Sequence, residues 1–306
     1  MRRFVNNIFI FCITLSLIIS GLVVFNAQES AAGFVRKNSS VYYQNADDSL
    51  ANGWQTIGGR IYYFRPNGKM LVGLHKIDDK KFYFNPKGDL GSIGSLKLGW
   101  VKIGKDYYYF RESGAVGTMG KMLRNIIAGT ADTGYYYVSK SGRRINDSTL
   151  SLAVKLVAER ASQAKSPEAK LKKCFKFLKK YYPYKRRYGL PDAGNISEKY
   201  ASYMFKHRKG NCYCFASSFA LIAKSLGYDT RINIGDITTP GGGPSPHGWA
   251  EVKIKGKWYL FDISMHRKCK NIPLYKIPKG KYPFKYHYDK RYSLKIKNNR
   301  AVWKKA

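Results

Sequence analysis

Alternating aromatic and polar positions fill the chain from Val41 to about Ile145. Such alternation in short runs, interrupted by the turn sequences PNG and PKG, predicts β-strands. The pattern recurs about every 20 residues, the spacing of stacked hairpins. In each repeat an aromatic triplet or its remnant ends four residues before a glycine: Phe64 and Gly68, Phe84 and Gly88, Phe110 and Gly114, Val138 and Gly142. A single hairpin cannot bury its aromatic face alone, so we expect an all-β solenoid of hairpins.

From Asp147 onward the apolar residues recur at helical spacing instead. Ser148 is a candidate N-cap for a first helix. Ser166 followed by Pro167 predicts the start of a second helix, because proline is favoured at the first helical position. Cys174 lies within this second helix and is interpreted as a buried core thiol.

A third helix is predicted to begin at Cys212, with Asn211 as its N-cap, and to end near Gly227. On a helical wheel Cys212 falls on the apolar face that would pack into the core. Cys214 lies about 200° away around the helix. The two thiols therefore point in different directions and are not expected to share a metal or form a disulfide with each other.

The position of Cys212 at a helix N-terminus favours a role as a nucleophile. A helix N-terminus carries partial positive charge and free N–H groups, and both stabilise a thiolate, which is the nucleophilic form of cysteine. The same N–H groups can hold the oxyanion that forms when a thiolate attacks a carbonyl. A nucleophile of this kind needs a base.

The segment PHGWAEVKIKGKWYLFDIS reads as a hairpin that offers this base. If Ile254 pairs with Lys257, this pairing sets which residues of the two strands lie opposite each other. His247 then lies opposite Ser264, and Asp262 is its diagonal neighbour on the same face. Asp262 can accept a hydrogen bond from one imidazole nitrogen of His247 while the other nitrogen faces the thiol, as in covalent acyl transfer.

Three stretches in this half resemble the core motifs of the transglutaminase-like superfamily. They are GNCYCFASSFALIAKSLGYDTRINIG, HGWAEV and KWYLFDIS, within residues 166–265. The resemblance implies a papain-like α+β fold, in which the helix that bears Cys212 packs on an antiparallel sheet. It implies Cys212 as nucleophile, His247 as base and Asp262 as the orienting residue, with no metal or cofactor. Amide hydrolysis, deamidation and crosslinking to an amine remain open.

The repeats resemble the cell-wall-binding repeats of choline-binding-type surface proteins, through the pattern GW…YYF…G. The resemblance implies aromatic cages that hold a quaternary ammonium by cation–π attraction. The cage-type positions are Trp54, Tyr63, Trp100, Tyr107 and Tyr109. Three residues depart from the pattern. Leu74 stands where tryptophan is expected, and Ile61 and Lys81 stand where an aromatic residue usually precedes the tyrosine pair. A lysine there repels a cation. Whether the ligand is choline, and whether some aromatics only stack the solenoid, stays open.

Charge and the N-terminus indicate where the protein acts. Lys and Arg outnumber Asp and Glu by 55 to 19, which gives a net charge of +36 and attraction to polyanions. Residues 1–27 read as a secretory signal, removed after Ala27 or at Ser30-Ala31-Ala32, or else kept as a membrane anchor. We therefore expect a wall polymer such as teichoic acid or peptidoglycan as a partner rather than nucleic acid. The segment from His266 holds 14 Lys and Arg against one acidic residue, and is either a polymer-binding surface or a solvated tail.

Together these features predict a secreted cell-surface cysteine enzyme with a protein or peptide substrate. The chain divides into a signal at 1–27, wall-binding repeats at 35–145, and a transglutaminase-like domain with a basic C-terminal segment at 148–306. The alternatives are a non-catalytic adhesin and a metal site formed by Cys212, Cys214, His266 and Cys269. A disulfide between Cys214 and Cys269 also stays open.

Overall fold

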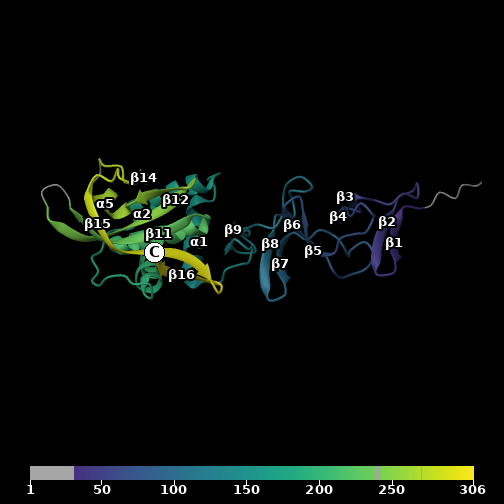
Figure 1. The fold of residues 1–306 in the computed structure, drawn as a ribbon, viewed down its shortest axis with the longest axis horizontal. Coiled ribbons are helices and arrows are strands. Elements are labelled where there is room, and N and C mark those ends of the chain that lie inside the picture. The colour runs from purple at the N-terminus through teal and green to yellow at the C-terminus, as the bar shows by residue number, and fades with distance from the viewer. Residues whose placement is uncertain (1–30, 239–241, 270) are drawn as a thin grey trace, which may run out of the picture.

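The computed structural model describes residues 31–238, 242–269 and 271–306. The predicted secretory signal lies outside the described residues. Among the described residues, no helix combines the length and apolar character needed to cross a membrane. A row of β-hairpins at the N-terminal side leads into a larger domain of mixed helix and sheet (Figure 1).

Each hairpin of the N-terminal half is a separate two-stranded antiparallel sheet, as the alternating pattern predicts. In the second hairpin Trp54 pairs with Tyr63 across the strands. In the fourth hairpin Trp100 pairs with Tyr109 in the same way. The strands are β1 (Gly33–Lys37), β2 (Ser40–Gln44), β3 (Gly53–Ile57), β4 (Arg60–Phe64), β5 (Gly73–Ile77), β6 (Lys80–Phe84), β7 (Gly99–Ile103), β8 (Asp106–Phe110), β9 (Ile126–Ala128) and β10 (Tyr136–Val138).

Six helices lie in the described part of the second half of the chain. They are α1 (Ser148–Ala161), α2 (Pro167–Tyr181), the π-helix η1 (Ile196–Ser202), α3 (Tyr203–His207), α4 (Cys212–Ser225) and α5 (Ile263–Lys268). Ser166 caps α2 as predicted, since its Oγ accepts a hydrogen bond from Ala169 N at 3.1 Å. The predicted cap of α1 is wrong by one residue. The Asp147 carboxylate accepts from Leu150 N at 2.8 Å, and Ser148 is already the first helical residue.

One antiparallel sheet of six strands forms the base of this domain, in the order β14-β13-β12-β11-β15-β16. The strands are β11 (Asp229–Thr238), β12 (Pro244–Ile254), β13 (Lys257–Phe261), β14 (Ile277–Pro278), β15 (Lys285–Lys297) and β16 (Arg300–Lys305). The basic C-terminal segment is therefore no solvated tail. Its strand β15 pairs directly with β11, and Leu294 and Trp303 are buried in the main core.

Helix α4 packs against β11 and β12 and is buried along its whole length. The helical wheel places Cys214, Ser217 and Lys224 opposite the apolar face, and the structure buries that side too, because α1, η1 and α3 pack on α4. Lys224 keeps an ion-pair partner there, since its Nζ lies 3.5 Å from Asp229 Oδ1. The helix is thus a central element of the domain rather than an amphipathic surface helix.

The last hairpin joins the repeats to the domain. Tyr137 of β10 and Ile145 are buried in the main core of the domain. The Tyr137 hydroxyl donates to Asn125 Oδ1 at 2.6 Å, and Asn125 Nδ2 donates to Gly227 O at 2.7 Å. Gly227 lies just after α4, so these bonds tie the end of the solenoid to the helix that begins with Cys212.

Candidate active site

The N-terminus of α4 presents Cys212 as predicted. Asn211 caps the helix, with its Oδ1 accepting from Cys214 N at 3.1 Å and its backbone carbonyl accepting from Phe215 N at 3.1 Å. This capping leaves the N–H groups of Cys212 and Tyr213 as first-turn donors that no helix carbonyl takes. Cys212 is only 4% exposed, so its sulfur lies beneath the surface at this end of the helix.

A glycine lets the helix approach the sheet closely at this point. Gly248 follows His247 on β12, and a Cβ at this position would overlap the ring of Tyr213. Because Tyr213 is the neighbour of Cys212, this contact brings the start of α4 against the strand that carries His247. The glycine therefore helps to determine the separation between thiol and imidazole.

The predicted hairpin register is confirmed, since Ile254 pairs with Lys257. His247 Nε2 lies 2.6 Å from Asp262 Oδ2. The strand β13 ends at Phe261, however, so the prediction that Ser264 sits opposite His247 in a strand is wrong. Asp262 instead caps the short helix α5, and its carboxylate reaches His247 from this cap position.

The Asp262 carboxylate is buried and fully hydrogen-bonded. Its Oδ1 accepts from Ser264 Oγ at 2.9 Å and from Met265 N at 3.0 Å. Its Oδ2 accepts from the Tyr282 hydroxyl at 2.6 Å in addition to His247. Burial alone would raise the pKa of Asp262, but His247 and these hydrogen bonds hold the pKa below its ordinary value.

His247 is buried between the carboxylate and the thiol. Burial alone would lower the pKa of His247, yet the Asp262 carboxylate and a hydrogen-bond interaction with Cys212 raise it. Since Nε2 faces Asp262, the nitrogen left for Cys212 is Nδ1. The structure thus brings Cys212, His247 and Asp262 together in the order thiol, imidazole, carboxylate.

Two tyrosines at this site were not predicted from the sequence. Tyr282 binds Asp262 from the loop between β14 and β15. Tyr184 lies beside Cys212, because Lys185 N donates to Gly210 O at 2.9 Å and so holds the segment after α2 next to the start of α4. Burial raises the pKa of Tyr184, and its interaction with Cys212 raises it further. No local pattern in the sequence marks either tyrosine.

A hollow of about 830 Å³ opens beside His247. Its wall includes Tyr184, Ser245 and Ser264. Four basic residues also line it, two from the end of α2 and two from the end of α5, with no Asp or Glu among the lining residues: Lys179, Lys180, Arg267 and Lys268. Among the described residues none of these four forms an ion pair.

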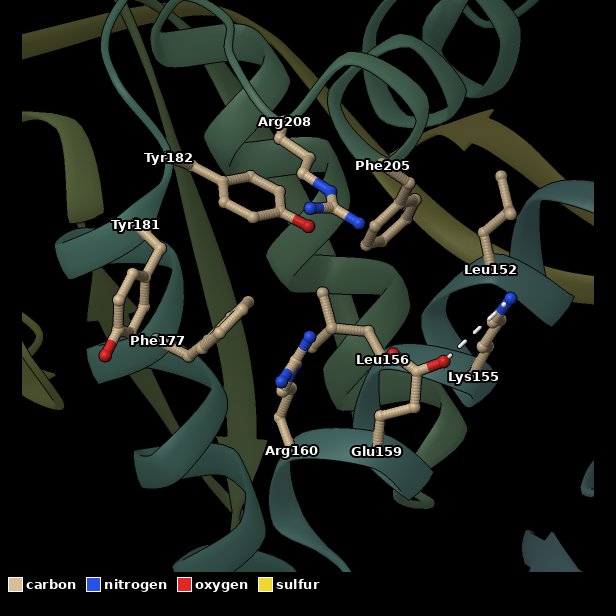
Figure 2. Close-up of a pocket in the computed structure, with 10 residues that line it drawn as sticks. All are labelled: Leu152, Lys155, Leu156, Glu159, Arg160, Phe177, Tyr181, Tyr182, Phe205 and Arg208. Atoms are coloured by element: carbon tan, nitrogen blue, oxygen red, sulfur yellow. Dashed lines mark ion pairs between the residues drawn. The ribbon is translucent and has the colours of Figure 1, made fainter. Parts of the chain in front are cut away.

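A second hollow, of about 660 Å³, lies between α1, α2 and α3 (Figure 2). Leu156 and Phe177 contribute apolar surface to it, and the guanidinium groups of Arg160 and Arg208 flank it. Cys212, His247 and Asp262 do not line this hollow. It is therefore separate from the candidate active site.

The other described cysteines form neither a disulfide nor a metal site. All four described cysteines are free, including Cys214 and Cys269. Burial raises the pKa of Cys174 to about 12 and that of Cys214 to about 11, which disfavours their thiolates. Within the described part of the chain, no three His, Cys, Asp or Glu side chains are grouped so as to hold a metal ion.

The predicted cage residues occupy two clusters. In the first, the Trp54 ring centroid lies 5.1 Å from that of Tyr63 and 4.9 Å from that of Phe82 in the next hairpin. In the second, the Trp100 centroid lies 5.0 Å from that of Tyr109. Tyr107 joins the second cluster through Arg144, whose guanidinium lies over both the Tyr107 and the Trp100 rings.

Family models match both halves of the chain. Residues 154–263 match the transglutaminase-like superfamily. Residues 51–92 match a choline-binding repeat, and residues 99–116 match a putative cell wall binding repeat. The chain therefore carries a transglutaminase-like domain preceded by choline-binding repeats, as the sequence motifs predict.

Solved structures similar to the chain share only part of it. Choline binding protein F of Streptococcus pneumoniae is 25% identical, over 38% of this chain and 34% of that chain, with a TM-score of 0.30. The multimodular pneumococcal cell wall endolysin from phage Cp-1 is 20% identical, over 40% of this chain and 39% of that chain, with a TM-score of 0.25. The chain thus covers less than half the length of either structure. No curated protein matches the chain.

Proposed function

We propose that the chain is a secreted cysteine enzyme of the cell surface that transfers acyl groups from peptide or glutamine-type amides. The observation that supports it most strongly is the buried line of Cys212, His247 and Asp262 at the N-terminus of α4. A thiol, an imidazole and an orienting carboxylate in this order form the arrangement of covalent acyl transfer.

In the proposed reaction the Cys212 thiolate attacks the amide carbonyl carbon while His247 carries the thiol proton. The oxyanion that forms lies within reach of the N–H groups of Cys212 and Tyr213, which the helix leaves free. His247 then donates its proton to the leaving amine, the C–N bond breaks, and an acyl-enzyme thioester remains. Water or a second amine attacks the thioester and releases the product and the free thiol. Asp262 keeps the imidazole oriented and favours its protonated form.

The hollow beside His247 supports a substrate with negative charge. Lys179, Lys180, Arg267 and Lys268 line it, and no carboxylate in its lining balances them. Several positive charges in one concave site concentrate their electric field there, and this attracts a negatively charged partner. We therefore propose an amide substrate that carries carboxylate or phosphate groups near the reacting bond.

The decisive assay for acyl transfer uses the full chain and two substrates in parallel. One reaction contains dansylcadaverine with glutamine-containing proteins, and the other contains peptides whose cleavage is followed by mass spectrometry. Amine incorporation that is lost in Cys212→Ala would identify crosslinking, and peptide cleavage lost in the same variant would identify hydrolysis. Activity that persists in Cys212→Ala would contradict the proposal.

We propose further that the repeats, as residues 35–145, attach the enzyme to the cell wall, and that residues 148–306 form the catalytic unit. The match to wall-binding repeat families supports this division. Sedimentation of the Cys212→Ala chain with purified cell walls tests it. Binding that is lost when residues 35–122 are deleted, which keeps the last hairpin on the domain core, supports attachment through the repeats, whereas unchanged binding assigns it to the basic surface of the other half.

A further inference from the structure

Arg144 occupies a position that recurs in the last four hairpin units, two residues after a glycine. At this position each of these units donates its backbone N–H to the preceding hairpin. The bonds are Met70 N to Val41 O at 2.8 Å, Leu96 N to Ile61 O at 2.7 Å, Met122 N to Lys81 O at 2.7 Å and Arg144 N to Tyr107 O at 2.8 Å. The first three side chains of the series are apolar, and the fourth is an arginine.

The apolar members pack beneath the glycine of the following unit. A Cβ at Gly94 would overlap Met70, and a Cβ at Gly120 would overlap Leu96. Met122 packs beneath Gly142 in the same way. After Arg144 no further hairpin follows, because α1 begins at Ser148. The Arg144 side chain therefore has no glycine to pack beneath, and it lies among the rings of Trp100 and Tyr107 in the preceding hairpin and of Tyr136 in its own unit.

The Arg144 guanidinium lies among three aromatic rings. Its central carbon is 4.4 Å from the Tyr107 centroid, 4.5 Å from the Tyr136 centroid and 5.6 Å from the Trp100 centroid. All three distances are within the ~6 Å at which a cation is attracted to a ring face. Among the described residues Arg144 forms no ion pair, so its charge faces the rings.

The equivalent place in the earlier units holds no cation. In the first cluster, formed by Trp54, Tyr63 and Phe82, the residue at the place of Arg144 is Leu96, which packs against it. The residue that corresponds to Tyr107 is Ile61 there, so a third ring wall is missing. Of these two clusters, only the one around Trp100 combines three aromatic rings with an arginine.

We propose that the cluster of Trp100, Tyr107 and Tyr136 is a cation-binding site whose ligand is the Arg144 guanidinium of the same chain. The site has the chemistry of a quaternary-ammonium cage, and Arg144 closes it at the end of the solenoid. An external quaternary ammonium such as choline binds there only when the arginine is removed.

The test is choline titration of the full chain by calorimetry, in the wild type and in Arg144→Ala. The variant is expected to gain a choline site at these rings that the wild type lacks. Adding Trp100→Ala to the variant should abolish that site. Arg144→Met introduces the residue found at Met70 and Met122. The methionine should fill the space among the rings, so this variant should gain no choline site. Arg143→Ala is the matched control, because Arg143 pairs with Asp106 at 3.1 Å and leaves the cage closed.

Two results would overturn the proposal. One is choline binding by the wild type that Trp100→Ala abolishes. The other is the absence of a gained site in an Arg144→Ala chain that unfolds at the same temperature as Arg144→Met. If Arg144→Ala does not fold, the proposal is tested instead by NMR of the Arg144 side-chain protons in the wild type. They should show upfield ring-current shifts that Tyr107→Ala removes, and their absence would also overturn the proposal.

Discussion

His247 Nε2 and Asp262 Oδ2 lie 2.6 Å apart, and both side chains are almost completely buried. Their proximity depends on a strand and a helix cap, because His247 sits on β12 while Asp262 precedes α5. A buried, hydrogen-bonded carboxylate at this position favours the imidazolium over the neutral imidazole. The catalytic importance of the two residues should therefore differ.

We expect His247→Ala to abolish turnover, because the imidazole is the base that interacts with the Cys212 thiol. Asp262→Asn should leave measurable activity, with a loss on the order of 10²–10⁴-fold, since it removes only orientation and charge. Steady-state rates on whichever substrate the screen identifies would check this. Full activity in Asp262→Asn would remove the orienting role.

Tyr282→Phe tests how much the hydrogen bond from Tyr282 to the Asp262 carboxylate contributes, with His247 itself unchanged. The substitution removes the hydroxyl that donates to Asp262 Oδ2 at 2.6 Å and keeps the ring that packs near Trp249. We expect a smaller loss than in Asp262→Asn, roughly 5- to 100-fold in kcat/KM, in line with one hydrogen bond to a charged group. A loss as large as that of His247→Ala would show that Tyr282 acts in another way.

Gly248→Ala should weaken the contact between α4 and β12. A Cβ there overlaps the Tyr213 ring, so the start of α4 must shift. We expect a destabilisation of about 1–3 kcal/mol, measured by urea unfolding, together with slower turnover. Gly243→Ala is the matched control, because a Cβ at Gly243 meets nothing within 4 Å. Equal effects of the two substitutions would contradict the importance of this close approach.

Charge reversal on α2 tests the proposed anionic substrate. Lys179→Glu with Lys180→Glu changes the lining of the hollow, whereas Lys172→Glu with Lys173→Glu makes the same change in charge on the same helix away from it. We expect KM for a peptide rich in Glu and Asp to rise at least about tenfold in the first variant only, and the effect to shrink at high salt. If both variants behave alike, the overall charge of the protein and not the hollow is responsible.

Much of the site could be predicted from the sequence because its signals are local. Asn211 before Cys212 marks a helix start, and the turn at Lys255-Gly256 sets the pairing of Ile254 with Lys257. Asp262 was predicted to reach His247 as a strand neighbour, whereas it does so as a helix cap. Short helices such as α5 leave little periodicity from which to predict this.

The remaining features depend on contacts between distant segments. Tyr184 and Tyr282 reach the site from loops, and nothing next to them in the sequence indicates their partners. Strand β15 was not anticipated, because the charge of this segment predicts a solvated tail or a polymer-binding surface instead. Apolar residues nevertheless alternate along it as in a strand: Tyr292, Leu294 and Ile296. Arg144 likewise looks like one more basic residue until the rings around it are seen.

The rate of Cys212 alkylation by iodoacetamide at pH 6, resolved by peptide mass spectrometry, tests the central claim most directly. We predict that Cys212 is modified well before Cys269, and that Cys174 and Cys214 remain unmodified because burial raises the pKa of each thiol. Since the Asp262 carboxylate raises the pKa of His247, Asp262→Asn should lower that pKa and slow the reaction at pH 6, because less imidazolium is then present to stabilise the thiolate. His247→Ala should slow it further at pH 6. Equal modification of Cys212 and Cys269, or a rate at Cys212 that His247→Ala leaves unchanged, would contradict the claim that Cys212 is a nucleophile activated by His247.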